Sequence, residues 1–296
     1  MSYRKVIGVA VLAALGSAAA GYYYLKERSE GPAEISSSTL ASEPMSDPGT
    51  ALPPAPATSS SPGSGANDKS EPIADTGLPL RAGEVLEYTA NVANLNDVAK
   101  LKLQIGERKD FFGKNAWHLQ AFAHTENPLR MVFVLDDQFD SYSDAASMTS
   151  LQYEMHLNER GQKVDSVQRM TATGKEPAPP HATETRVLPG TRDPLGMLQY
   201  LRNVDWTKTA EVRSPVYDGH KLYDVRAKLV GPGEAITVPA GTFKASKIEM
   251  RVFENGEEMK DAHFTIYLAN NVARTPVLLE AIMPFATATV ELQKAK

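Results

Sequence analysis

Apolar and polar residues alternate along most of the chain from residue 78 onward, as they do in β-strands that bury one face. Turn-forming residues separate the alternating stretches, so the pattern predicts eleven or twelve strands, nearly all in antiparallel succession. The predicted strands include residues 85–88, 101–105, 117–122, 151–157, 163–170, 211–217, 221–229, 243–253, 258–268, 276–282 and 287–292, and the last two are joined by a bend at Pro284.

Short turns connect several of these strands. Asn255-Gly256 and Asp218-Gly219 each stand between two alternating stretches. Both dipeptides favour the positive φ angles of a two-residue hairpin turn. Residues 158–161 (Asn-Glu-Arg-Gly) predict another short hairpin connection. We therefore expect a sheet built mainly from hairpins between strands that are neighbours in sequence.

Residues 239–244, Pro-Ala-Gly-Thr-Phe-Lys, raise the question of an anion-binding loop. A phosphate loop needs several glycines leading into a helix, with a lysine placed for the phosphate. Here a single glycine, Gly241, leads into a strand, and Pro239 and Gly241 suit the second and fourth positions of a type I turn. The pattern favours a corner between two strands, with Lys244 at a solvent-facing position.

One helix interrupts the strands at residues 193–202. Asp193 is a good N-cap residue, and Pro194 suits the first helical position. Leu195, Leu198 and Leu201 then follow at helical spacing and predict one narrow apolar face. A second, weaker helical pattern covers residues 128–135.

The N-terminal 28 residues have the composition of a membrane anchor. Residues 6–25 are an uncharged run of twenty residues, long enough to cross about 30 Å of hydrocarbon as a helix. Three tyrosines end the run, and Arg4 and Lys5 before it favour a cytoplasmic N-terminus. The alternative is a cleaved signal peptide, because Ala18-Ala19-Ala20 offers a cleavage site. Under both interpretations the body of the protein is exported to the periplasm, and under the first it is held on the inner membrane as a single-pass protein.

Residues 29–76 are rich in Ser, Pro, Ala, Gly and acidic residues. Such a segment buries too little apolar surface to offset the entropy lost on ordering, so we expect a disordered tether. About fifty flexible residues reach roughly 40 Å on average. The chain is thus predicted to contain an anchor or signal at 1–28, a linker at 29–76 and a β-rich domain at 77–296.

Composition excludes several chemistries. The chain has no cysteine, which excludes disulfides, cysteine metal sites, a cysteine nucleophile and a lipid-modified N-terminal cysteine. Its net charge is −5, which is not the signature of nucleic-acid binding. We predict no cofactor.

The acidic and histidine residues form no recognisable catalytic or metal motif. Asp136, Asp140 and Asp144 share a strand face, but residues four apart on a strand are separated by about 13 Å. His118 and His124 share a face about 20 Å apart, too far to bind one metal ion. The other four histidines stand singly in the sequence, and we expect them to be exposed or to have structural partners: His156, His181, His220 and His263. No catalytic, cofactor-binding or metal-binding residue is therefore predicted.

Four short motifs in order resemble a known bacterial family. They are Gly83-Glu84-x-Leu86-x-Tyr88, Asp140-x-Tyr142-x-Asp144, the Asp193–Arg202 helix with its Tyr200-Leu201-Arg202, and the Pro-Ala-Gly-Thr-Phe corner. Together they are similar to the exported family named domain of unknown function 3108, over about residues 80–292. The resemblance implies export and a curved antiparallel sheet or half-open barrel, like LolA-like lipoprotein carriers or lipocalins. It implies no catalytic residue.

These observations favour a non-catalytic protein of the cell envelope that binds or carries an amphipathic, lipid-like ligand, or acts as an assembly scaffold. The alternative is a hydrolase of an envelope lipid or glycan whose site is assembled from distant strands. A wide antiparallel sheet curls, and its concave face needs filling. We expect an apolar cavity beside the helix, with these candidate lining residues: Trp117, Leu119, Ile248, Met250, Phe264 and Ile266.

Limited proteolysis tests the predicted linker. Because residues 29–76 lack core-forming side chains, a broad-specificity protease should cut there and leave a stable fragment that begins near Leu78. N-terminal sequencing and the mass of the fragment would locate the cut. Resistance of this segment in the isolated protein would contradict the tether interpretation.

Overall fold

The computed structural model of the chain describes residues 79–296, apart from 132, 160, 173–180 and 284–285. The predicted anchor or signal, the predicted linker and the bend at Pro284 lie outside the described residues. Among the residues that are described, no helix is long and apolar enough to cross a bilayer.

The described residues form one sheet of thirteen strands in the order β7-β6-β5-β4-β3-β2-β1-β13-β12-β11-β10-β9-β8. All neighbouring strands are antiparallel except β6 and β7, which are parallel. The fold class is therefore mainly β, as the alternating pattern predicts. The strands are β1 (Val85–Val92), β2 (Leu95–Phe111), β3 (Lys114–Thr125), β4 (Asp136–Asp144), β5 (Ser150–Glu159), β6 (Gln162–Thr171), β7 (Thr183–Arg186), β8 (Glu211–Tyr217), β9 (Leu222–Val238), β10 (Gly241–Glu254), β11 (Glu257–Ala269), β12 (Pro276–Met283) and β13 (Ala286–Ala295).

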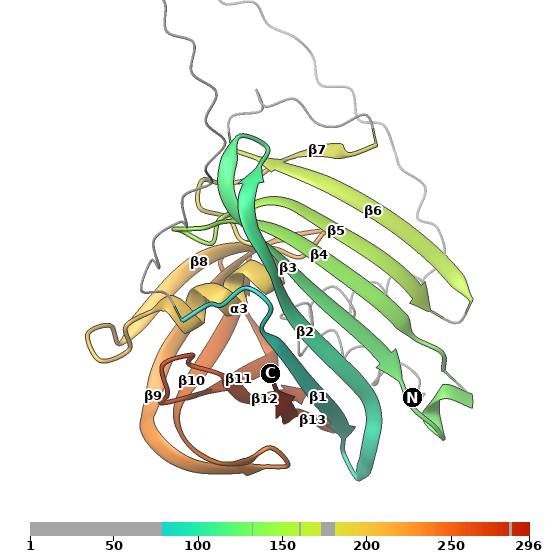
Figure 1. The fold of residues 1–296 in the computed structure, drawn as a ribbon, viewed down its shortest axis with the longest axis vertical. Coiled ribbons are helices and arrows are strands. Elements are labelled where there is room, and N and C mark those ends of the chain that lie inside the picture. The colour runs from blue at the N-terminus through green and yellow to red at the C-terminus, as the bar shows by residue number, and fades with distance from the viewer. Residues whose placement is uncertain (1–78, 132, 160, 173–180, 284–285) are drawn as a thin grey trace, which may run out of the picture.

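The first and last strands meet in the middle of the sheet. Tyr88 of β1 pairs with Leu101 of β2 on one side and with Leu292 of β13 on the other. Two halves, β1–β7 and β8–β13, therefore extend in opposite directions from the β1–β13 junction (Figure 1). Each half grows by pairing strands that are neighbours in sequence.

The two faces of the sheet differ in polarity. The register places Leu101, Ala121 and Phe139 on one face, and all three are buried. Lys102 and Gln138 occupy the opposite face, which is more exposed and polar. The apolar face lies on the inside of the curved sheet, where the core forms.

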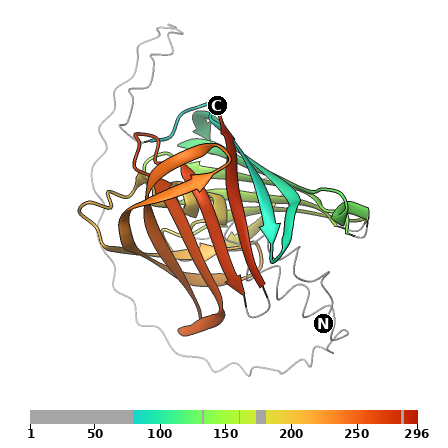
Figure 2. The ribbon, with the colours of Figure 1, turned by 90° about the horizontal axis from the view of Figure 1, so that it is seen from below.

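Helix α3 (Pro194–Asn203) lies inside the curve of the sheet (Figures 1 and 2). Asp193 is its N-cap, Pro194 stands at its start, and Gly196 N donates a 2.8 Å hydrogen bond to Asp193 Oδ1, as predicted. The helix approaches the ends of β4 and β5 closely. A Cβ atom at Gly196 would lie 2.9 Å from Ser143 Oγ and 3.0 Å from Met148 O, so this contact requires glycine.

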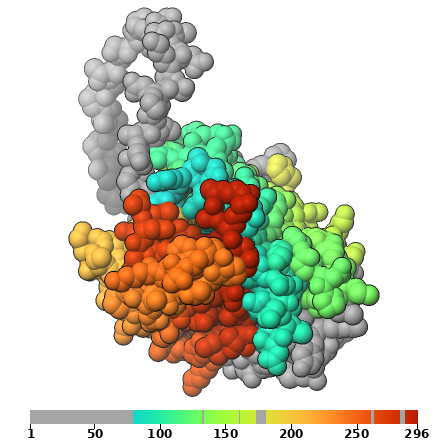
Figure 3. Space-filling view, turned by 60° about the horizontal axis from the view of Figure 1, so that its bottom comes forward, coloured from blue at the N-terminus to red at the C-terminus, as the bar shows by residue number. Residues whose placement is uncertain are grey.

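The β9–β10 ribbon folds back over the sheet and ends at the predicted corner. Val238 and Gly241 pair across Pro239-Ala240, which confirms a hairpin between two strands. Ala240 N then donates a 3.0 Å hydrogen bond to Leu292 O of β13. The ribbon (orange) accordingly lies against the C-terminal strand (red) in Figure 3. This hydrogen bond joins the end of the ribbon to the strand at the centre of the sheet.

One predicted turn has a different form. Asn255-Gly256 is a two-residue hairpin with positive φ at both residues, because Glu254 pairs with Glu257. At Asp218-Gly219, however, Tyr217 pairs with Leu222, which leaves a four-residue loop. The side chain of Asp218 explains the difference, because its Oδ1 accepts hydrogen bonds from His220 N and Lys221 N, both at 2.8 Å.

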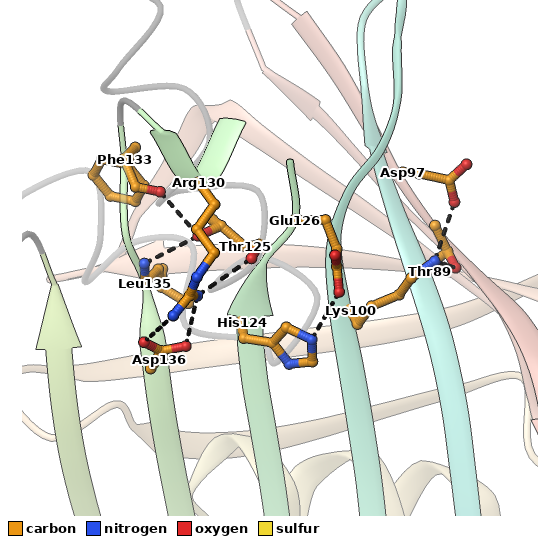
Figure 4. Close-up of polar contacts among 10 residues, drawn as sticks. All are labelled: Thr89, Asp97, Lys100, His124, Thr125, Glu126, Arg130, Phe133, Leu135 and Asp136. Atoms are coloured by element: carbon orange, nitrogen blue, oxygen red, sulfur yellow. Dashed lines mark hydrogen bonds and ion pairs between the residues drawn. The ribbon is translucent and has the colours of Figure 1, made fainter. Parts of the chain in front are cut away.

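The prediction of a helix at residues 128–135 is wrong. Among the described residues of this segment, the helical part is one turn of 3₁₀-helix at Leu129–Met131. Thr125 competes for the backbone of this segment: its Oγ1 donates to Phe133 O at 2.9 Å and accepts from Leu135 N at 3.1 Å. Arg130 also forms two 2.8 Å contacts with Asp136 at the start of β4 (Figure 4). These contacts hold the segment against the sheet as a loop. The pattern also missed the short edge strand β7.

Substitutions at the β9–β10 corner test this assignment. Gly241 has φ of +132°, so Gly241→Val should lower the free energy of unfolding by about 1 kcal/mol or more through backbone strain. Lys244→Ala, at an exposed position, should change it little. Chemical denaturation measures both. A large loss at Lys244 with none at Gly241 would contradict the hairpin.

Candidate ligand-binding cavity

A buried carboxylate fixes the N-terminal end of α3. Asp193 is fully buried, and its Oδ2 accepts hydrogen bonds from Ser150 Oγ and, at 2.5 Å, from Ser141 Oγ. Asp193 N donates to Ser150 Oγ at 2.7 Å. Burial raises the pKa of Asp193, while the hydrogen bonds from Ser141, Ser150 and Gly196 oppose the rise. The start of the helix is thus tied to both β4 and β5.

A buried ion pair fixes the other end. The Arg202 side chain is fully buried, and its Nη1 and Nη2 each lie 2.8 Å from a carboxylate oxygen of Glu84. Nη2 also donates to Ala273 O at 2.8 Å. Arg274 donates to Arg202 O and Val204 O at 2.9 and 2.7 Å, which satisfies two carbonyls at the end of the helix. The helix is therefore held at both ends by polar contacts with the sheet and its loops.

An apolar cavity of about 50 Å³ lies between α3 and the second half of the sheet. The helix presents one face to it, and strands β8 to β13 supply the facing wall. Thr265 and Glu280 are the two polar residues that border the cavity. They lie opposite each other on β11 and β12, and Glu280 Oε2 accepts a hydrogen bond from Tyr267 Oη. The remaining lining residues are apolar: Pro194, Met197, Leu198, Leu201, Val216, Val225, Met250, Val252, Phe264, Ile266, Leu279, Ala281, Ala288 and Val290.

The volume indicates what the cavity holds at rest. A cavity needs about 10–15 Å³ to hold one water molecule, whereas a cavity that takes benzene measures about 150 Å³. The present cavity therefore admits only a short hydrocarbon segment without rearrangement. Met197 and Met250 line it on opposite walls. Methionine side chains are unbranched and flexible, so these two residues are the ones able to move aside for a longer chain.

The lining predicted from sequence is partly confirmed. Met250, Phe264 and Ile266 border the cavity. Trp117, Leu119 and Ile248 do not, and they are buried in the core instead. On the helix, Leu198 and Leu201 line the cavity, while Leu195 is buried outside it. Pro194 and Met197 were missed, although the spacing 194, 197, 198, 201 is that of one helix face.

The three aspartates of β4 have separate structural partners. Asp136 pairs with Arg130, and Asp144 Oδ1 accepts from Ala146 N and Ser147 N in the turn after the strand. Asp140 accepts from Gln120 and Gln138 and lies 2.7 Å from His118 Nε2. Burial opposes its ionisation, but these hydrogen bonds outweigh burial and hold the pKa of Asp140 below its usual value.

The histidines likewise lie apart. His118 stacks on Tyr142 with ring centroids 4.7 Å apart, and burial raises the pKa of that tyrosine to about 12. His124 lies 3.0 Å from Glu126 (Figure 4), and His156 lies 2.8 Å from Asp165. His181 and His263 are exposed. Within the described part of the chain, no three His, Asp or Glu side chains are placed to hold a metal ion.

The comparison with protein families agrees with the motifs. A family model described as "Protein of unknown function (DUF3108)" matches residues 87–293. The chain belongs to the DUF3108 family. Three of the motifs that carry the resemblance meet at α3 in this DUF3108 fold. Glu84 binds Arg202, Asp193 begins the helix, and Ser141, between Asp140 and Tyr142, binds Asp193.

Three solved structures are similar to this chain at low sequence identity. A β-barrel-like DUF1849 protein from Brucella abortus has 10% identity and a TM-score of 0.47, covering 73% of this chain and 97% of its own. A candidate lipoprotein from Parabacteroides distasonis has 14% identity and a TM-score of 0.36, covering 74% and 98%. A candidate exported protein with a YmcC-like fold from Bacteroides fragilis has 13% identity and a TM-score of 0.33, with the same coverage. No curated protein matches the sequence.

The ion pair of this DUF3108 protein can be tested by substitution. Glu84→Gln leaves the buried Arg202 guanidinium without its counter-charge, so the free energy of unfolding should fall by about 3 kcal/mol. Glu87→Gln removes the exposed pair with Lys296 and serves as the matched control, for which we expect a small effect. Denaturant titration of both variants measures the difference. Equal effects would contradict an anchoring role for Glu84.

Proposed function

We propose that this DUF3108 protein is a non-catalytic protein of the cell envelope that binds the hydrocarbon part of an amphipathic, lipid-like ligand in the cavity beside α3. The observation that carries the proposal is the apolar lining of that cavity on the concave face of the sheet. A hydrocarbon chain gains about 0.8 kcal/mol for each methylene group that it buries. Apolar ligands therefore fit this site better than polar ones.

The surroundings of the cavity support reversible binding. The helix is held at its ends, through Asp193 and Arg202, while its middle supplies Met197 and Leu198 to the lining. A ligand can therefore displace side chains in the middle without releasing the helix. Half-open barrels of the LolA-like and lipocalin-like kind use a concave face in the same way, and we include this chain among them by analogy of fold.

Location in the envelope rests on the N-terminal sequence. Residues 6–25 suit a membrane anchor or signal peptide, and residues 29–76 suit a tether that lets the body reach into the periplasm. An inner-membrane anchor would keep the cavity within reach of the lipids of that membrane. In this arrangement the protein would act as a carrier or a sensor of such a lipid.

Binding of a neutral apolar dye tests the proposal. N-phenyl-1-naphthylamine, which fluoresces in apolar surroundings, should bind saturably to the full-length chain after removal of bound lipid. Ala288 is buried and lines the cavity, so the larger side chain of Ala288→Leu should fill it. Binding of the dye should weaken about tenfold, which corresponds to the loss of two buried methylene groups. Fluorescence titration gives the affinities.

The same substitution at an exposed alanine is the control. Ala235→Leu on β9 adds the same side chain outside the cavity and should leave dye binding unchanged. Thermal unfolding of each variant shows whether it is folded. Absence of saturable binding by the parent chain would leave a scaffold role in place of ligand binding. Equal loss in both variants would place the bound dye elsewhere.

A further inference from the structure

Arg192 is a buried arginine whose charge meets no carboxylate among the described residues. It is 9% exposed, and its guanidinium lies 3.7 Å from the centre of the Tyr200 ring. Nη1 donates to Ser214 Oγ at 2.8 Å and to Gly190 O at 3.2 Å, and Nη2 donates to Ser147 O at 2.7 Å. Nε is buried and has no hydrogen-bond acceptor in the described structure. All of these partners are uncharged.

Arg202 in the same fold provides a direct contrast. Arg202, ten residues later, is also buried, but Glu84 neutralises it with two contacts. A buried cation without a counter-charge is costly, and buried arginines are rare unless they are paired. Burial accordingly lowers the pKa of the Arg192 guanidinium. Arg192 therefore has an unmet preference for an anion.

Backbone pairing places Arg192 beside the cavity. Arg192 N donates to Pro215 O at 3.0 Å, and Tyr217 N donates to Arg192 O at 2.8 Å, so Arg192 lies opposite Val216 of β8. Val216 lines the cavity, and Ser214, which binds the guanidinium, is two residues further along the same face of the strand. Two residues on a strand span about 7 Å. Pro194, two residues after Arg192, also lines the cavity.

We propose that Arg192, with Tyr200 against its guanidinium, binds the anionic head group of the ligand whose hydrocarbon chain occupies the cavity. This inference rests on the proposed function and specifies its ligand class as a single-chain amphiphile with a carboxylate or phosphate head. The buried Nε donor has no acceptor among the described residues, so an anion could bind it once neighbouring side chains move aside. The nearest acidic residue in sequence, Asp193, does not fill it, because its oxygens accept from Ser141, Ser150 and Gly196.

Calorimetric titration with three ten-carbon ligands tests the head-group site. Decanoate, decyl phosphate and decanol share one chain length and differ in the charge of the head. The full-length chain, stripped of lipid, should bind the two anions roughly tenfold or more tighter than the alcohol, since hydrogen bonds to charged groups are the stronger ones. Decanoate and decyl phosphate together show whether the site prefers carboxylate or phosphate.

Substitution of Arg192 identifies the residue responsible. Arg192→Gln should abolish the preference for anions while decanol still binds, and Arg192→Lys should keep part of it. Arg213→Gln is the matched control, because Arg213 lies one residue from Ser214 on the exposed face of β8 and pairs with Asp224. It should keep the full preference. The Lys variant and the three parent titrations remain informative if the Gln variant is unstable.

The outcomes separate this inference from the proposed function. Equal affinities of the parent chain for decanoate, decyl phosphate and decanol would overturn the head-group site and leave the apolar cavity in place. A preference for anions that survives Arg192→Gln would also overturn it. Failure of all three ligands and of the neutral dye to bind would overturn the proposed function and, with it, this inference.

Discussion

A curved sheet of thirteen strands has one apolar face that must be kept from water, and α3 is the helix that covers it. The rest of the described structure depends on this cover. A ten-residue helix is marginal alone, so its position comes from contacts with the sheet and not from its own stability. Polar groups make those contacts. Asp193 ties the start of the helix to β4 and β5, and Arg202 ties its end to Glu84 just before β1.

Buried polar contacts of this kind specify position more than they add stability. Apolar packing alone would let α3 slide or rotate on a smooth surface of leucine, valine and alanine side chains. A carboxylate that needs Ser141 and Ser150, and a guanidinium that needs Glu84, are satisfied in one arrangement. The cavity follows from this constraint, because a helix fixed at its ends cannot settle fully against the facing wall of β8–β13.

Both halves of the sheet contact the helix, and the second half also forms the wall of the cavity. The first half holds α3 through Glu84, just before β1, and through β4 and β5, while the loop between β11 and β12 contacts the end of the helix through Ala273 and Arg274. The β9–β10 ribbon returns to β13 through Ala240 and Leu292. Arg192, just before the helix, contacts both halves, because it donates to Ser147 O in the β4–β5 turn and to Ser214 Oγ of β8. Its backbone lies opposite Val216 and two residues before Pro194, and both of these residues line the cavity.

The amino-acid sequence by itself determined most of the elements, because alternation, turn dipeptides and helix caps are local. The strands, the hairpins at Asn255-Gly256 and Pro239-Ala240, and the cap at Asp193 all follow from neighbours in the chain. Sequence also grouped the motifs now seen around α3, without showing why they belong together. The segment 128–135 was misassigned because its backbone bonds to Thr125, a contact that periodicity does not register.

Only the tertiary structure decided the pairing of β1 with β13, the position of α3 and the site beside it. These depend on residues far apart in sequence, such as Glu84 with Arg202 or Ala240 with Leu292. Alternation shows that Ile248 and Met250 face inward but not that Met250 lines a cavity while Ile248 is packed in the core. That no carboxylate of the described residues pairs with Arg192 is likewise invisible in sequence, because a charge finds a partner only once the chain has folded around it.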